Sequence, residues 1–207
     1  MIKYIVVALA IGIIAGYANN NYGPAFPNGW VSDYLFNFSL LLLLFVMGFA
    51  FGADEQAAAN LRKTGWRIFI VPLSIAVGSI FGGLVGGYIL GINLAGSMAV
   101  SAGFGWYTLT GPLAGQLFGA EFGALGFATN FLRELFTILA ASLLVKAGKY
   151  APIASGGATA MDTTLPVIVR YCGSDSLIIA FLSGFVLSLI APFIITAIAS
   201  LPNALSF

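Results

Sequence analysis

Long apolar runs with very few charges constrain this chain more than any other feature. The 207 residues include eight Lys and Arg and seven Asp and Glu, and 60% of the residues are hydrophobic. A water-soluble domain has about 25% charged residues, whereas this chain has 7%. So few charges cannot cover a surface in water, but they suffice for the loops of a helix bundle in a bilayer. The sequence therefore predicts an all-α polytopic membrane protein.

Five of the apolar stretches are typical of membrane-spanning helices, because about 20 apolar residues cross the hydrocarbon core. These predicted spans are residues 4–17, 34–53, 66–90, 121–145 and 176–201. The first is short and follows Lys3, as in a secretory signal peptide, but no A-x-A cleavage site comes after it. A retained first helix is the favoured interpretation, and a signal peptide is the alternative.

Two further apolar stretches, residues 94–119 and 151–170, are poor material for continuous helices. Glycine, threonine and proline interrupt both of them, including Gly103, Gly105, Gly111, Gly157 and Pro166. Irregular backbone at membrane depth is tolerated only where protein buries it or where it lines a wet cavity. We expect each stretch to be a broken hairpin that enters the membrane and returns on the same side.

The distribution of Lys and Arg supports this topology, since positive charges favour the cytoplasm. Lys3 and the basic loop at residues 54–67 are placed inside, which puts the end of span 66–90 outside. Lys146 and Lys149 then also reach the cytoplasm only if residues 94–119 return to the outside. The prediction is one membrane transport domain, residues 1–207, with a cytoplasmic N-terminus and an external C-terminus.

The two hairpins also resemble each other. Residues 101–112 align without gaps on residues 155–166 and match at a Ser, a Gly, a Thr and a Pro. Two broken segments that enter from opposite sides are typical of inverted-repeat secondary transporters. We therefore expect the substrate site where the hairpins meet.

Charged and polar side chains gather in the fourth span. Arg133 and Glu134 lie at its midpoint, and Asn130 shares their sector of the helix. A charge at this depth costs at least a few kcal/mol, which favours a functional role for Glu134 over an ion pair that fastens helices. For Arg133 the two interpretations remain equal.

Asp162 is the acidic residue of the broken hairpins, and Thr163 and Thr164 follow it. Asp162 could bind a cation or a proton from a partly desolvated position, or it could cap a half-helix that starts at Thr163. The other hairpin contributes Trp106, Tyr107 and Thr108 as candidate contacts. The two aromatic rings could face an ammonium group or could only fill space.

Several classes of function are disfavoured by composition. The chain has no His and a single Cys, Cys172, so Ser-His-Asp chemistry and His-based or clustered-Cys metal sites are absent. We predict no metal and no cofactor. There is no basic run of the kind that binds nucleic acid.

Three motifs resemble the lysine exporter (LysO) family. They are Gly-Phe-Gly-Trp-Tyr-Thr-Leu-Thr-Gly at residues 103–111, the Arg133-Glu134 pair, and Gly-Ala-Thr-Ala-Met-Asp-Thr-Thr-Leu-Pro-Val at residues 157–167. The resemblance runs from about Phe36 to the end of the chain. It implies export of L-lysine and analogues such as thialysine across the cytoplasmic (inner) membrane, with Glu134 and Asp162 matching the family's functional acids.

Longer members of that family carry an additional N-terminal membrane region. The chain resembles their C-terminal part, so we expect a homodimer or a small companion membrane subunit. The predicted mechanism is lysine/proton antiport, in which Asp162 and Glu134 bind either a proton or the substrate ammonium. Arg133, or the positive N-termini of the half-helices, would hold the substrate carboxylate.

Other functions remain as alternatives. One is a sodium-coupled carrier of a small carboxylate metabolite, and another is a transport subunit that needs a second membrane chain. An intramembrane aspartyl protease is disfavoured, because the sequence has no GxGD motif and no second mid-membrane Asp.

Overall fold

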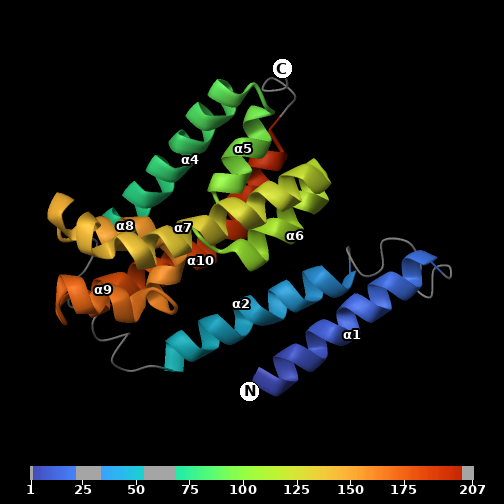
Figure 1. The fold of residues 1–207 in the computed structure, drawn as a ribbon, viewed down its shortest axis with the longest axis horizontal. Coiled ribbons are helices and arrows are strands. Elements are labelled where there is room, and N and C mark those ends of the chain that lie inside the picture. Colours follow the sequence, from blue (N-terminus) through green and yellow to red (C-terminus); the bar gives the residue numbers. More distant parts are fainter. Residues whose placement is uncertain (1, 22–33, 54–68, 202–207) are drawn as a thin grey trace. The chain divides into compact units, whose positions relative to one another are not determined.

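The computed structural model describes residues 2–21, 34–53 and 69–201, and the regular elements in these ranges are all helices (Figure 1). Three of the described helices are long and apolar enough to span a membrane: α4 (Ile70–Leu90), α7 (Ala120–Ala147) and α10 (Ser176–Ala199). The all-helical prediction is confirmed. The total of five spans stays a prediction, and the basic loop at residues 54–67 lies outside the described residues.

The chain divides into two compact units, residues 1–50 and 51–207. The first unit contains α1 (Ile2–Asn21) and most of α2 (Phe36–Ala53). α1 is longer than the apolar run at residues 4–17 that predicted it, because the helix continues through the polar residues at its end. A 20-residue helix rises about 30 Å, which matches the thickness of a hydrocarbon core.

The second unit holds both predicted hairpins, and each is broken near its centre. Residues 94–119 form α5 (Leu94–Ser101) and α6 (Tyr107–Phe118), separated by residues 102–106, called the first break below. Residues 151–172 form α8 (Ala151–Gly156), the 3₁₀ helix η3 (Gly157–Met161) and α9 (Leu165–Cys172). Residues 157–164 are called the second break.

Left-handed backbone conformations produce the breaks. In the first break, Phe104 has φ 53° and Gly105 has φ 103°; in the second, Gly157 has φ 62°. Glycine adopts such angles without a steric penalty, whereas Phe104 is a strained exception. Pro112 does not break the chain, although we expected it to disfavour a helix: it lies within α6. Its missing N–H leaves the Thr108 carbonyl without a helical partner.

Glycines set the packing of α6 against α7. A Cβ on Gly123 would lie 3.0 Å from the Gly115 Cα, and one on Gly126 would lie 3.0 Å from the Thr110 carbonyl oxygen. The two helices therefore touch backbone to backbone over the N-terminal half of α7, as small residues allow in membranes. α10 is the most buried of the three long helices and contacts α5, α6 and η3.

Candidate functional site

The first and second breaks meet through their backbones. The Ala158 N–H donates to the Phe104 carbonyl oxygen at 2.8 Å. A Cβ on Gly105 would lie 2.8 Å from the Gly156 carbonyl oxygen, and a Cβ on Gly157 would collide with the Phe104 carbonyl. Only glycine permits so close an approach at these positions. The two broken hairpins therefore meet within the second unit. The place where the first and second breaks touch is called the centre below.

Asn130 of α7 is buried and holds the first break. Its Oδ1 accepts from the Gly105 N–H at 2.6 Å. Its Nδ2 donates to the carbonyl oxygens of Val100 at 2.9 Å and Gly126 at 2.8 Å. A side-chain amide has two donor hydrogens and one acceptor oxygen, and all are used here. Asn130 is predicted as a substrate contact, but in the structure its side-chain amide forms its hydrogen bonds with the protein backbone.

Arg133, one turn further along α7, contacts the end of α8. Its Nε donates to the Ser155 carbonyl at 2.8 Å and its Nη2 donates to the Ala154 carbonyl at 2.9 Å. Its Nη1 donates to the Ser79 Oγ of α4 at 3.0 Å. The last carbonyls of a helix have no partner within it, and the guanidinium supplies one. All three of its nitrogens are thus bonded to protein.

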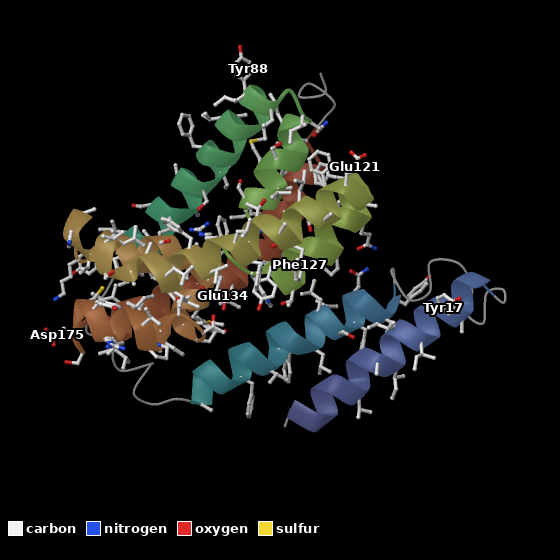
Figure 2. The ribbon with its side chains drawn as sticks, in the orientation of Figure 1. Tyr17, Tyr88, Glu121, Phe127, Glu134 and Asp175 are labelled. Carbon is white, nitrogen blue, oxygen red and sulfur yellow. The ribbon has the colours of Figure 1, made fainter. Side chains whose placement is uncertain are left out.

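Glu134 lies beside Arg133 but in different surroundings. The side chain is half-buried, and its Oε2 is buried without a hydrogen-bond partner among the described residues. Figure 2 shows Glu134 and Phe127 along the same helix, and a separation of seven residues places them on one face. A buried carboxylate oxygen without a partner is costly, which makes Glu134 a candidate for binding a cation.

Asp162 lies in the second break, between η3 and α9. Its side chain is exposed in the described structure, so the expected partial desolvation is not seen. Its Oδ1 accepts from the backbone N–H of Thr163 at 2.6 Å and from the Thr163 Oγ1 at 3.4 Å. The half-helix begins at Leu165 rather than Thr163, and Thr164 is its N-cap without a side-chain cap bond. The second carboxylate oxygen, Oδ2, has no such local bond assigned to it.

Tyr107 belongs to an aromatic cluster. Its ring packs edge-on against Phe127, with centroids 5.3 Å apart, and against Phe131 at 5.6 Å. Tyr107 also lies within electrostatic range of Glu134 on α7 and Asp162 in the second break.

The remaining candidate residues divide between surface and interior. Thr108 and Thr163 are exposed, and Trp106 is half-buried. Thr164 is fully buried, with its Oγ1 3.4 Å from the Thr159 Oγ1, which in turn donates to the Gly156 carbonyl at 3.0 Å. Thr164 therefore stabilises the second break from within.

The predicted glycine and proline positions have local roles. A Cβ on Gly103 would collide with the Thr110 Oγ1, and one on Gly111 would lie 3.2 Å from the Phe127 Cβ. Pro166 stands in the first turn of α9, where its missing N–H costs nothing. These residues permit the close packing of the hairpins and do not present functional groups.

A cavity of about 310 Å³ opens between α4, α5 and α7, and Arg133 is part of its lining. Its walls include Gly82, Gly86, Phe122, Leu125, Asn130 and Arg133. Glu134, Asp162 and Tyr107 do not line it. No group of three or more His, Cys, Asp or Glu within the described ranges could hold a metal ion.

Several site residues escaped sequence reasoning, namely Ser79, Phe127, Phe131, Ser155 and Thr159. A signal existed for some of them. The alignment of the two hairpins has an offset of 54 residues (155 minus 101). Two pairs at that offset are in contact, Phe104 with Ala158 and Ser79 with Arg133. Extending the alignment into the preceding helices would have paired Ser79 with Arg133.

Comparisons with known proteins agree with these features. The family model described as lysine exporter LysO matches residues 6–199. The lysine exporter LysO of Escherichia coli (strain K12) is 34% identical over 158 residues, which make up 76% of this chain and 52% of that protein. A Haemophilus influenzae (strain ATCC 51907 / DSM 11121 / KW20 / Rd) protein named "Putative lysine exporter" is 27% identical over 197 residues, covering 94% of this chain and 96% of that protein.

This chain thus spans about half the length of the Escherichia coli relative and nearly all of the Haemophilus influenzae relative. No solved structure matches it.

Proposed function

Because this chain belongs to the lysine exporter LysO family, a family of transporters and not of enzymes, we propose that it exports L-lysine from the cytoplasm. The apolar spans support a membrane protein, and we place it in the cytoplasmic (inner) membrane as a multi-pass transporter. The observation that carries the proposal is that two carboxylates, Glu134 and Asp162, both lie within electrostatic range of Tyr107. Two carboxylates match the cationic side chain that distinguishes lysine from neutral amino acids.

In the proposed site the lysine ammonium binds between the two acids. Glu134 offers the buried oxygen without a partner, and Asp162 offers the oxygen that does not bond to Thr163. The ring of Tyr107 adds a face that attracts cations. A buried carboxylate holds either a proton or a cation, since either one neutralises it. This argument applies to Glu134, whose Oε2 is buried, and in the proposed site Glu134 exchanges substrate for a proton while the exposed Asp162 also binds the ammonium.

Proton antiport also solves an energetic problem. Moving one positive charge outward against an inside-negative potential costs about 2.3 kcal/mol per 100 mV. One proton entering for each lysine that leaves cancels this cost. The pH and lysine gradients then drive export without a resident cofactor.

Three of the five N–H donors of Arg133 bond to protein, so we propose a separate partner for the substrate carboxylate. The N-terminus of α6 begins at Tyr107, next to the acids. Helix N-termini favour anions through their free N–H groups and dipole. We assign the carboxylate to this end of α6, with Thr108 beside it.

Growth in a host lacking its own lysine exporters tests the proposal. Cells that express this chain should tolerate thialysine or a lysine dipeptide, and Asp162→Asn should abolish the tolerance at equal membrane expression. Full tolerance with Asp162→Asn would contradict the site. Failure of the unmodified chain, followed by rescue with a co-expressed second membrane chain, would instead show that a companion subunit is required.

Dependence of lysine efflux on a sodium gradient, with no response to a proton gradient, would contradict proton antiport. Purification in mild detergent would show whether the chain forms a homodimer, which is the alternative to a companion membrane subunit.

A further inference from the structure

α7 presents two polar side chains, one turn apart, to two different breaks. Asn130 bonds to Gly105 and Val100, which lie in and before the first break. Arg133 bonds to Ala154 and Ser155, which precede the second break. Residues three apart in a helix lie on the same face. The two breaks are therefore fixed to one rigid element by separate side chains.

Arg133 is suited to its partners by charge as well as by geometry. The end of a helix carries partial negative charge on its last carbonyls, and a cation placed there is stabilising. α8 has only six residues and too few internal bonds to be stable alone. Thr137, one turn beyond Arg133, adds a bond between its Oγ1 and the Ser155 Oγ at 2.7 Å. The end of α8 is thus held by α7 rather than by its own helix.

Asp162 depends on this anchor. The chain runs from the end of α8 through η3 directly to Asp162, and the Asp162 N–H donates to the Thr159 carbonyl at 3.1 Å. Glu134 is adjacent to Arg133 on α7. The same helix therefore carries one acid and the side chain that anchors the other.

We propose that Arg133 is a positioning residue, which fixes the second break and with it the distance between Asp162 and Glu134, and that it does not bind the substrate carboxylate. The proposal rests on the proposed function, since the two acids are taken as the substrate site. It assigns Asn130 the matching role for the first break.

Spin-label mobility tests the anchoring without any need for transport. Cys172→Ser removes the single cysteine, and a nitroxide label is then attached at Thr163→Cys or at Thr108→Cys in proteoliposomes. Arg133→Gln should increase the mobility of the label at position 163 and leave that at position 108 unchanged. Asn130→Ala should do the reverse.

A general loss of stability would raise the mobility of both labels in both variants. Equal increases in mobility at positions 163 and 108 would therefore overturn the proposal. An unchanged label at position 163 in Arg133→Gln would overturn it as well. Arg133→Lys keeps the charge but cannot reproduce three directed bonds, so it should give an intermediate result.

Transport kinetics test the second half of the proposal. If Arg133 only positions the second break, Arg133→Gln should lower the maximal rate of lysine efflux about tenfold or more, and KM should rise with it, since a misplaced Asp162 weakens the site for the ammonium. A KM raised more than about tenfold at an unchanged maximal rate would show a contact with the carboxylate and overturn the proposal. If lysine proves not to be the substrate, the label experiment still decides the anchoring.

Discussion

Arg133 and Glu134 are neighbours in sequence, but their side chains differ in how fully they are hydrogen-bonded in the fold. Adjacent helical residues point about 100° apart, so Arg133 faces the end of α8 and Glu134 faces a different sector around the helix. The guanidinium is bonded at all three nitrogens, whereas the carboxylate keeps one buried oxygen unpaired. A residue that bonds to the protein through all three of its nitrogens is suited to hold structure. A residue with an unpaired hydrogen-bonding atom is suited to bind a substrate or an ion reversibly.

Glu134→Gln should therefore abolish lysine efflux while keeping or raising thermal stability. The variant removes a charge that no protein partner compensates, so folding loses little. Efflux from preloaded vesicles and the melting temperature in detergent measure the two effects. Glu121→Gln is the matched control, because Glu121 is exposed in the first turn of the same helix, and it should retain efflux. A large fall in melting temperature with Glu134→Gln would show that the carboxylate is a structural group.

Gly157→Ala should prevent formation of the centre where the breaks meet. Its φ of 62° disfavours any side chain, and a Cβ would collide with the Phe104 carbonyl. We expect a loss of folding stability of about 3 kcal/mol or more, as for other clashes at strained positions. Gly148→Ala is the control, since nothing lies within 4 Å of a Cβ there, and it should be neutral. Equal yields of folded protein from both variants would contradict the packing of the breaks.

At the scale of elements, the long helices and the two broken stretches were predictable from sequence, because apolar length and clustered Gly, Thr and Pro are local signals. The path of the backbone through each break was not predictable from sequence. Pro112 lies inside α6, and η3 fits because Gly184 of α10 lets that helix approach Met161 and Ala158. The partners of Asn130 and the α8 carbonyls bonded to Arg133 were equally hidden, whereas the repeat offset would have paired Arg133 with Ser79. Such tertiary contacts leave no trace in the local pattern.

Gly86 of α4 and Gly126 of α7 differ in the space beside them, and alanine substitutions can measure the effect of this difference on stability. Gly126→Ala should destabilise the hairpin of α6 and α7, because the new Cβ would lie 3.0 Å from the Thr110 carbonyl oxygen. Gly86→Ala has open space beside it and should be neutral or slightly stabilising through helix propensity, by at most about 1 kcal/mol. Unfolding in a denaturing detergent compares the two. Equal stability would argue against close packing of α6 on α7.

For the whole molecule, the internal repeat pairs a long helix and a broken hairpin with a second such unit. α4 precedes α5 and α6, and α7 precedes α8 and α9. Contacts between positions 54 residues apart are expected near a pseudo-two-fold axis, where equivalent residues meet. Phe104 with Ala158 and Ser79 with Arg133 are such pairs. An axis in the membrane plane would make the two hairpins enter from opposite sides.

The proposed topology follows from this repeat and can be decided by chemical labelling. If the first hairpin returns to the outside, Glu121 at the start of α7 lies outside, and Lys149 beyond its end lies in the cytoplasm. In the Cys172→Ser background, an impermeant thiol reagent added to intact cells should label Glu121→Cys and should reach Lys149→Cys only after permeabilisation. Ser174→Cys, exposed between α9 and α10, should behave like Lys149→Cys if the second hairpin returns to the cytoplasm.

A first hairpin that crossed the membrane once would reverse the labelling of Glu121→Cys and Lys149→Cys together. A second hairpin that crossed would instead separate Ser174→Cys from Lys149→Cys. The two hairpins are thus tested independently, and the inverted repeat requires both to return to the side from which they entered. That arrangement would let the site between the breaks be reached from either face of the membrane, as alternating access demands.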